Sequence, residues 1–280
     1  MIIFPLYDFW SNWLISFAIL MIRYLIIAGI PFLIFYIAFP KTFFSKKIQG
    51  RRIKKQVIET EISSSIVSFI IFAGFMATII IFNQMGYTRI YADIFQYGFW
   101  YLPLSFILLL IIHDTYFYWI HRMMHLPILF KHIHAHHHRS KSPTPWAAFS
   151  FHPVEAILEF IFIIPVVFIL PVHLYVFIVF AFAMTIINVL GHLGYELFPK
   201  NFLKRPIGKL FNTTTHHDMH HHYTKGNYGL YFNIWDRLMR TNHKRYEQEF
   251  EKNCNKASVV TDKEDVYLLG LEYGKRAKFR

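Results

Sequence analysis

The 280-residue sequence contains one cysteine and few charged residues, and each scarcity excludes a class of protein. Cys254 cannot form an internal disulfide or build a cysteine-based zinc ribbon by itself. Charged residues make up 16% of the chain, against about 25% in soluble proteins. Hydrophobic residues reach 55% and aromatic residues 19%. The composition therefore predicts a membrane-embedded protein rather than an ordinary soluble domain.

Acidic residues are also scarce, with 17 Asp and Glu against 29 Lys and Arg, which gives a formal net charge of +12. The positive charges flank apolar runs and form no stripe on a soluble fold, so no nucleic-acid partner is expected. One short segment is expected to be a cytosolic loop, because Lys and Arg concentrate on that side of a membrane. Its positive residues are Lys41, Lys46, Lys47, Arg51, Arg52, Lys54 and Lys55.

No histidine occurs before His113, although the chain has 17 of them. Three groups follow, in the segments HRMMH, HAHHH and HDMHH. Residues three or four apart share one face of a helix, so each group can offer its imidazoles to a common centre. Eight imidazoles exceed the four ligands of a tetrahedral zinc, so the spacing predicts two metals. The eight are His121, His125, His134, His137, His138, His217, His220 and His221.

Imidazole suits iron, zinc, copper and nickel, so the spacing alone does not choose the metal. No HExxH segment occurs, which argues against a zinc protease of that type. A metal transporter or sensor with histidine-rich loops is the alternative of another class. Transporters usually place ionisable groups inside the membrane along a pathway, whereas these histidines stand at the ends of apolar runs. The pattern therefore favours an enzyme.

Long apolar runs indicate where the chain crosses the membrane. Residues 9–39, 63–84 and 98–120 are each predicted to cross, because about 20 apolar residues span the hydrocarbon core. The first run is either one tilted helix or a helix bent near Gly29 and Pro31. Residues 155–190 are predicted to form a hairpin, because a single crossing would put the third histidine group on the opposite face from the first two.

The expected fold is all-α. It is an integral membrane helical bundle with about four transmembrane helices or hairpins and a cytosolic, histidine-rich di-metal cap. Three regions are expected: an N-terminal transmembrane region at 1–112, a catalytic domain at 113–242 and a cytosolic C-terminal tail at 243–280. The membrane is expected to be a bacterial inner membrane or the endoplasmic reticulum.

Three segments resemble the motifs of the fatty acid hydroxylase and sterol desaturase superfamily, over roughly residues 110–241. They are DTYFYWIHRMMH, HAHHHRSKSPTPWAAFSFHPVE and HHDMHHHYTKGNYGLYFNIWDRL. The run SPTPW…FHPVE is most similar to the lathosterol oxidases (sterol carbon-5 desaturases) and the sterol methyl oxidases. The resemblance implies two non-heme irons held by the eight histidines and by His192 in NVLGHLGYE. Two positions depart from the family pattern: Asn188, where acyl-chain hydroxylases tend to have histidine, and Arg240, where glycine is common.

The function that this resemblance implies is O₂-dependent desaturation or hydroxylation of a lipid, with a sterol-like substrate favoured. Fatty acyl, alkylglycerol and carotenoid substrates stay open. No heme-binding HPGG run occurs, so electrons are expected from a separate b-type cytochrome or ferredoxin. Metal-bound histidines usually donate their other N–H to a carboxylate or carbonyl oxygen, and Asp114 and Asp218 are the expected carboxylates. Glu155 and Glu196 are weaker candidates for the same role, and His216 could support the third group.

Overall fold

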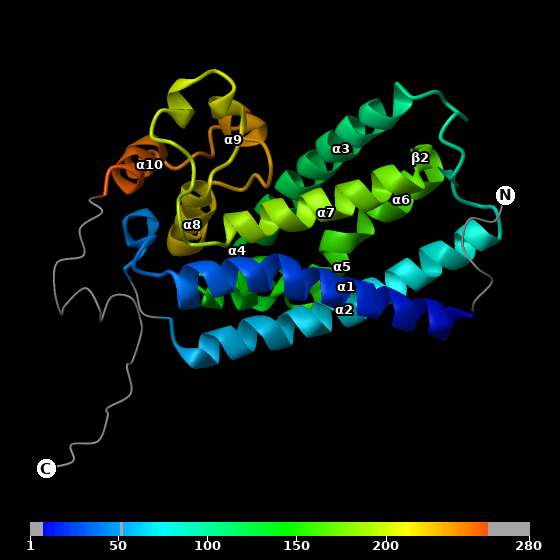
Figure 1. Ribbon diagram of the computed structural model, residues 1–280, viewed down its shortest axis with the longest axis horizontal. Helices are drawn as coiled ribbons and strands as arrows, with labels where there is room; N and C mark the ends of the chain where they lie inside the picture. Colours follow the sequence, from blue (N-terminus) through cyan, green and yellow to red (C-terminus); the bar gives the residue numbers. More distant parts are fainter. Residues whose placement is uncertain (1–7, 51–52, 257–280) are drawn as a thin grey trace, which may run out of the picture.

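A computed structural model describes residues 8–50 and 53–256 of the chain (Figure 1). Arg51 and Arg52 of the predicted basic loop and residues 257–280 of the predicted tail lie outside the described residues. Within the described part, four helices are long and apolar enough to cross a membrane. They are Phe9–Ala38, which joins α1 (Phe9–Phe32) to a π-helical turn at Leu33–Ala38, α2 (Lys55–Gln84), α3 (Tyr101–Met124) and α7 (Leu174–Gly191). The predicted all-α membrane bundle is confirmed.

Shorter elements connect and cap these spans. The α-helices are α4 (Pro127–His132), α5 (Pro153–Ile161), α6 (Ile163–Ile169), α8 (Thr214–Tyr223), α9 (Ile234–Leu238) and α10 (Tyr246–Cys254). Single 3₁₀ turns are η2 (Phe44–Lys46), η3 (His134–Arg139), η4 (Pro145–Phe149), η5 (Phe202–Lys204) and η6 (Gly208–Leu210). The two strands, β1 (Ile90–Tyr91) and β2 (Val172–His173), pair in parallel.

The first apolar run forms one span. Its start is fixed by Asp8, whose carboxylate accepts hydrogen bonds from the amides of Trp10 and Ser11 at 2.8 and 3.0 Å. Pro31 has no N–H to donate, so the regular α-helical ladder is interrupted there and the chain continues as the π-helical turn up to Ala38. The run is therefore a single helix that changes form after its proline.

Small buried residues let α1 and α2 pack closely. Ala28 and Ala73 are completely buried in a cluster that also holds Tyr24 and Phe69. The outward face of α1 is apolar as well, with Ile22 57% exposed. A helix that is apolar on both its packed and its exposed face suits a lipid environment.

The predicted hairpin over 155–190 is confirmed, although its two arms differ. The outgoing arm is the pair of short helices α5 and α6, and α6 accommodates Pro165 in its first turn, where no N–H is needed. The arm ends at β2, which pairs with β1 at the end of the bundle far from α8 (Figure 1). The long helix α7 then returns, so that His192 lies at the same end as His121.

The first part of the predicted tail contains helix α10, which packs against the rest of the protein. Helix α10 lies against α8, and Tyr246 and Phe250 form a small core with Met219 and Leu203. Lys256 donates to the carbonyl oxygens of Lys47 and Ile48, which ties this segment to the basic loop.

Tyr24 offers a test of the α1 packing. Its hydroxyl donates to the carbonyl oxygen of Trp146 at 2.7 Å, and its ring is 1% exposed. We expect Tyr24→Phe to lower the free energy of unfolding by about 1 kcal/mol, the usual net contribution of one such hydrogen bond. Thermal unfolding in detergent measures this, with Tyr175→Phe, 65% exposed, as the matched control. Equal stability of the two variants would contradict the assignment.

Candidate metal centre

Nine histidines meet at one end of the bundle, and four segments supply them. His121 lies in the last turn of α3 and His125 caps that helix. The turn η3 supplies three histidines, His192 caps α7, and α8 supplies the last three. Thr213 caps the N-terminus of α8, and its hydroxyl accepts from the amide of His216. These nine are the same histidines that the spacing and the family resemblance predicted as metal ligands.

The nine histidines form two groups, and within each group one ring nitrogen of every member lies within 4.8 Å of the others. The five-histidine group consists of His121, His125, His134, His138 and His220. The four-histidine group consists of His137, His192, His217 and His221. This arrangement offers two adjacent binding positions, one per group.

Each HxxHH triplet is divided between the groups, so the expectation that a triplet serves one common centre was wrong. Residues four apart stay together, as His134 with His138 and His217 with His221 show. The intervening histidine of each triplet goes to the other group. Consecutive residues on an α-helix point about 100° apart, so His220 and His221 face different positions.

The ring nitrogens show that these groups suit metal ions. Five rings have Nδ1 within 2.8–3.2 Å of a backbone carbonyl oxygen, which can only accept, so Nδ1 carries the proton and Nε2 carries a lone pair. Yet Nε2 of His192 lies 3.3 Å from that of His137 and 3.2 Å from that of His221, and all three rings belong to this set. Two lone pairs cannot form a hydrogen bond, whereas a cation between them satisfies both.

Burial keeps these imidazoles neutral. Removal from water lowers the pKa of His192 to about 4 and that of His138 to about 3, the latter with a further contribution from His121. The pKa values of His137 and His217 are well below the usual range, chiefly for the same reason. Metals bind the neutral ring, so protons compete weakly for these sites at neutral pH.

The carboxylate that contacts the cluster is Glu155. Its Oε1 lies 2.7 Å from Nδ1 of His134, and both side chains are almost completely buried. Asp114, the carboxylate expected from the sequence, lies in α3 about two helical turns before His121. Asp114 instead accepts from the amides of Tyr231 and Phe232 and makes no hydrogen bond to the nine histidines in the described structure. Its role is to hold the loop that follows α8.

Three further residues support the cluster from outside. Asp218 accepts from the side chain of Gln49, which joins the third histidine group to the basic loop. His216 faces Asp236, with 3.4 Å between Nε2 and Oδ2. Asn188 donates its amide to the carbonyl of Ala148, while its own backbone carbonyl accepts from His192. His216 belongs to neither group.

Arg240 stands in a left-handed backbone conformation, with φ of 55°. This region favours glycine, because a Cβ there meets the carbonyl oxygen. The glycine common at this position in the family therefore has a local backbone reason, and Arg240 is tolerated at an exposed turn.

The part of the chain that carries the histidines matches a known protein family. The sequence model of the fatty acid hydroxylase family matches residues 106–241. This region belongs to the fatty acid hydroxylase family. It contains all eight histidines of the three groups and His192 between them, and the extent predicted from the motifs is confirmed.

Curated relatives are similar over a wider range. A Delta(7)-sterol 5(6)-desaturase of Gibberella zeae is 34% identical over 66% of this chain and 57% of its own length. A lathosterol oxidase of Rattus norvegicus is 39% identical over 55% of this chain and 50% of its own. A Delta(7)-sterol 5(6)-desaturase of Leptosphaeria maculans is 30% identical over 82% and 60%. The chain thus spans about half the length of these relatives, and no solved structure matches it.

Metal content tests the two-group arrangement. We expect about two metal ions per chain in protein purified without chelators, since each group offers at least four imidazoles. His217→Ala should lower the content to about one or less, whereas His132→Ala, exposed and outside both groups, should leave it unchanged. Elemental analysis per chain measures both. One ion or none in the unaltered protein would contradict the arrangement.

Glu155 gives a separate prediction. Its hydrogen bond fixes which nitrogen of His134 carries the proton, so Glu155→Gln should weaken metal affinity by about 10–100-fold. Competition with a graded series of chelators measures the change. Glu159→Gln, one turn further along α5, is the matched control and should retain the original affinity.

Proposed function

We propose that this protein is a membrane-bound di-iron oxidoreductase that uses O₂ to desaturate or hydroxylate a lipid, with a sterol-like substrate first. The observation that carries the proposal is the pair of buried histidine groups whose unprotonated nitrogens face one another. The relatives named sterol desaturases and lathosterol oxidases support the sterol-like substrate. Fatty acyl, alkylglycerol and carotenoid lipids are the alternatives.

In this proposal each histidine group holds one non-heme iron. Bound irons supply the oxygen chemistry needed to remove hydrogen from an unactivated carbon. The chain's own residues hold and orient that site. Glu155 and the backbone carbonyls fix the Nδ1 proton of six of the nine rings, and the buried surroundings keep water away from the reacting position.

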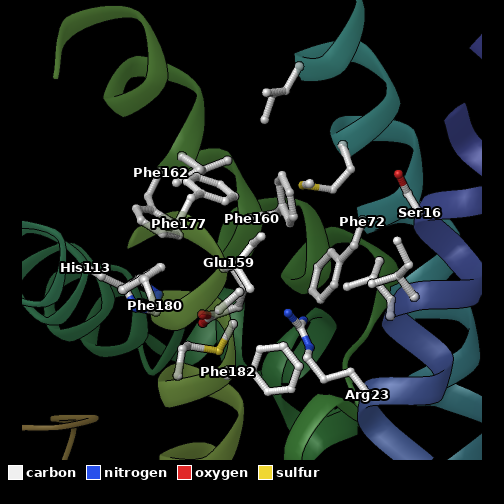
Figure 2. A pocket seen from close by; sticks show the side chains of 18 of the residues that line it. Ser16, Arg23, Phe72, His113, Glu159, Phe160, Phe162, Phe177, Phe180 and Phe182 are labelled. Carbon is white, nitrogen blue, oxygen red and sulfur yellow. The ribbon is translucent and has the colours of Figure 1, made fainter. Parts of the chain in front are cut away.

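An apolar cavity beside the cluster suits a lipid. It has a volume of about 470 Å³ and lies between α1, α2, α3, α5 and α7 (Figure 2). Phe117 lines the cavity and packs on His121, with ring centres 5.0 Å apart. Phe151 lines it too and packs on His137 at 5.4 Å. The cavity is thus one side chain away from both groups, and a lipid entering between the spans would reach them without passing through water.

The electron donor in this proposal is a separate b-type cytochrome or ferredoxin. The basic loop lies at the histidine end of the bundle, where Lys47 pairs with Tyr195 and Gln49 contacts Asp218. Positive charge concentrates on the cytosolic side of membrane proteins, so this end is assigned to the cytosol, in a bacterial inner membrane or the endoplasmic reticulum. A basic face also suits an acidic redox partner.

Lipid analysis tests the function. Cells that accumulate Δ7-sterols for lack of a sterol desaturase should form an additional oxidised sterol when they express this protein, as mass spectrometry would show. His137→Ala should reduce the product at least about 100-fold because it removes a member of the four-histidine group. His132→Ala should leave it intact. An unchanged lipid profile with metal-loaded protein in the membrane would defeat the proposal.

A further inference from the structure

Two charged side chains face the apolar cavity from different helices. Arg23 comes from α1 and Glu159 from α5, and Figure 2 shows both pointing into the same space among phenylalanine rings. Within the part of the chain that the structure describes, neither makes a hydrogen bond or an ion pair. Charged groups at membrane depth are costly and usually pair with one another or serve a function. These two share a cavity without touching, which leaves room for a group between them.

Both residues lie at the end of the cavity nearest the histidines. Arg23 is the last cavity-lining residue of α1, which runs toward the cluster, and Glu159 is the first of α5, which runs away from it. Glu159 follows Glu155 by about one helical turn, roughly 6 Å of rise, and Glu155 contacts His134. The lining along α7 extends from Asn188 at this end to Leu174 at the other, roughly 21 Å of apolar helix.

The chemistry of the pair selects a hydroxyl group. A guanidinium only donates hydrogen bonds, whereas the oxygens of a carboxyl group can accept them. A hydroxyl can accept from Arg23 and donate to Glu159 at once. A carboxylate or phosphate head could pair with Arg23 but not with Glu159, and an ammonium head could pair with Glu159 but not with Arg23, so neither kind of head is matched by both side chains.

We propose that Arg23 and Glu159 bind the hydroxyl of a lipid alcohol, so that the protein selects alcohols over acids, amines and ethers and oxidises the molecule near its polar end. This rests on the proposed function for the oxidation, although the binding itself does not require it. The apolar body of the lipid then lies along α7, away from the histidines. The pair determines specificity and position and takes no part in the oxygen chemistry.

Binding to the metal-loaded full chain in detergent tests the proposal. The probes are radiolabelled lathosterol and its 3-methyl ether, with octadecan-1-ol and its methyl ether as a second skeleton. We expect the alcohol of at least one skeleton to bind about tenfold or more tightly than its ether, because a site built for a hydroxyl rejects the analogue that cannot donate. Octadecanoic acid should bind more weakly than octadecan-1-ol.

Variants assign the preference to the pair. Glu159→Leu should bring the alcohol-to-ether ratio to within about twofold of one while leaving ether affinity unchanged, which also shows that the cavity is folded. Arg23→Met should weaken alcohol binding about tenfold. Glu59→Leu, on the exposed first part of α2, is the matched control and should keep the original ratio.

Two results would overturn the proposal. One is a wild-type ratio near one with both skeletons, and the other is an unchanged ratio in Glu159→Leu. A purely structural role would instead lower the thermal stability of the lipid-free variants and weaken alcohol and ether alike. The proposed oxidation fails separately, since a protein that binds alcohols with this preference but leaves cellular sterols unchanged would lose the enzyme assignment and keep the binding site.

Discussion

Within each histidine group, unprotonated ring nitrogens lie close to one another, and the surrounding structure maintains that unfavourable contact. Lone pairs repel, and buried polar atoms without partners are costly. Backbone carbonyls from Tyr228, Ser150, Asn188, Gly226 and Ser140 fix the opposite nitrogen of five rings. These carbonyls come from four segments: the loop after α8, the last turn of α7, and the residues that follow η3 and η4, so all four must be in place before the rings can adopt this orientation. The cluster therefore requires the whole fold, and a metal ion removes the repulsion that remains.

The spans and the histidine positions could be predicted from sequence, because apolar length and i, i+4 spacing are local properties. The hairpin over 155–190 was predictable for a different reason: the separated histidine groups had to share one face of the membrane. The division of each triplet was not predictable from spacing alone, since it depends on where the second centre lies in space. Glu155 was ranked too low because sequence distance placed Asp114 closer to a histidine face, whereas the turn through Ser150 and Phe151 brings α5 against His134.

The cavity could not be predicted from the apolar runs. Arg23 is a charged residue within the apolar run at 9–39, and Glu159 lies within the apolar stretch at 155–190, so no local pattern links the two. Only the packing of α1 and α5 on either side of the cavity brings the two together with Phe117 and Phe151 near the cluster. The role of a single charged residue in an otherwise apolar helix thus depends on the residues that face it across the packed structure.

Because each histidine triplet contributes to both groups, changes in the length of these segments affect the two metal positions together. Inserting or deleting one residue would rotate the following histidines by about 100° in α8 and by about 120° in the 3₁₀ helix η3, and would disturb both positions together. An insertion or deletion in either segment therefore affects both positions at once, whereas replacing a single histidine affects one group. The spacing within a triplet therefore sets the geometry of both metal positions. Homologous proteins that keep this spacing to hold one metal also keep the arrangement of histidines around the other.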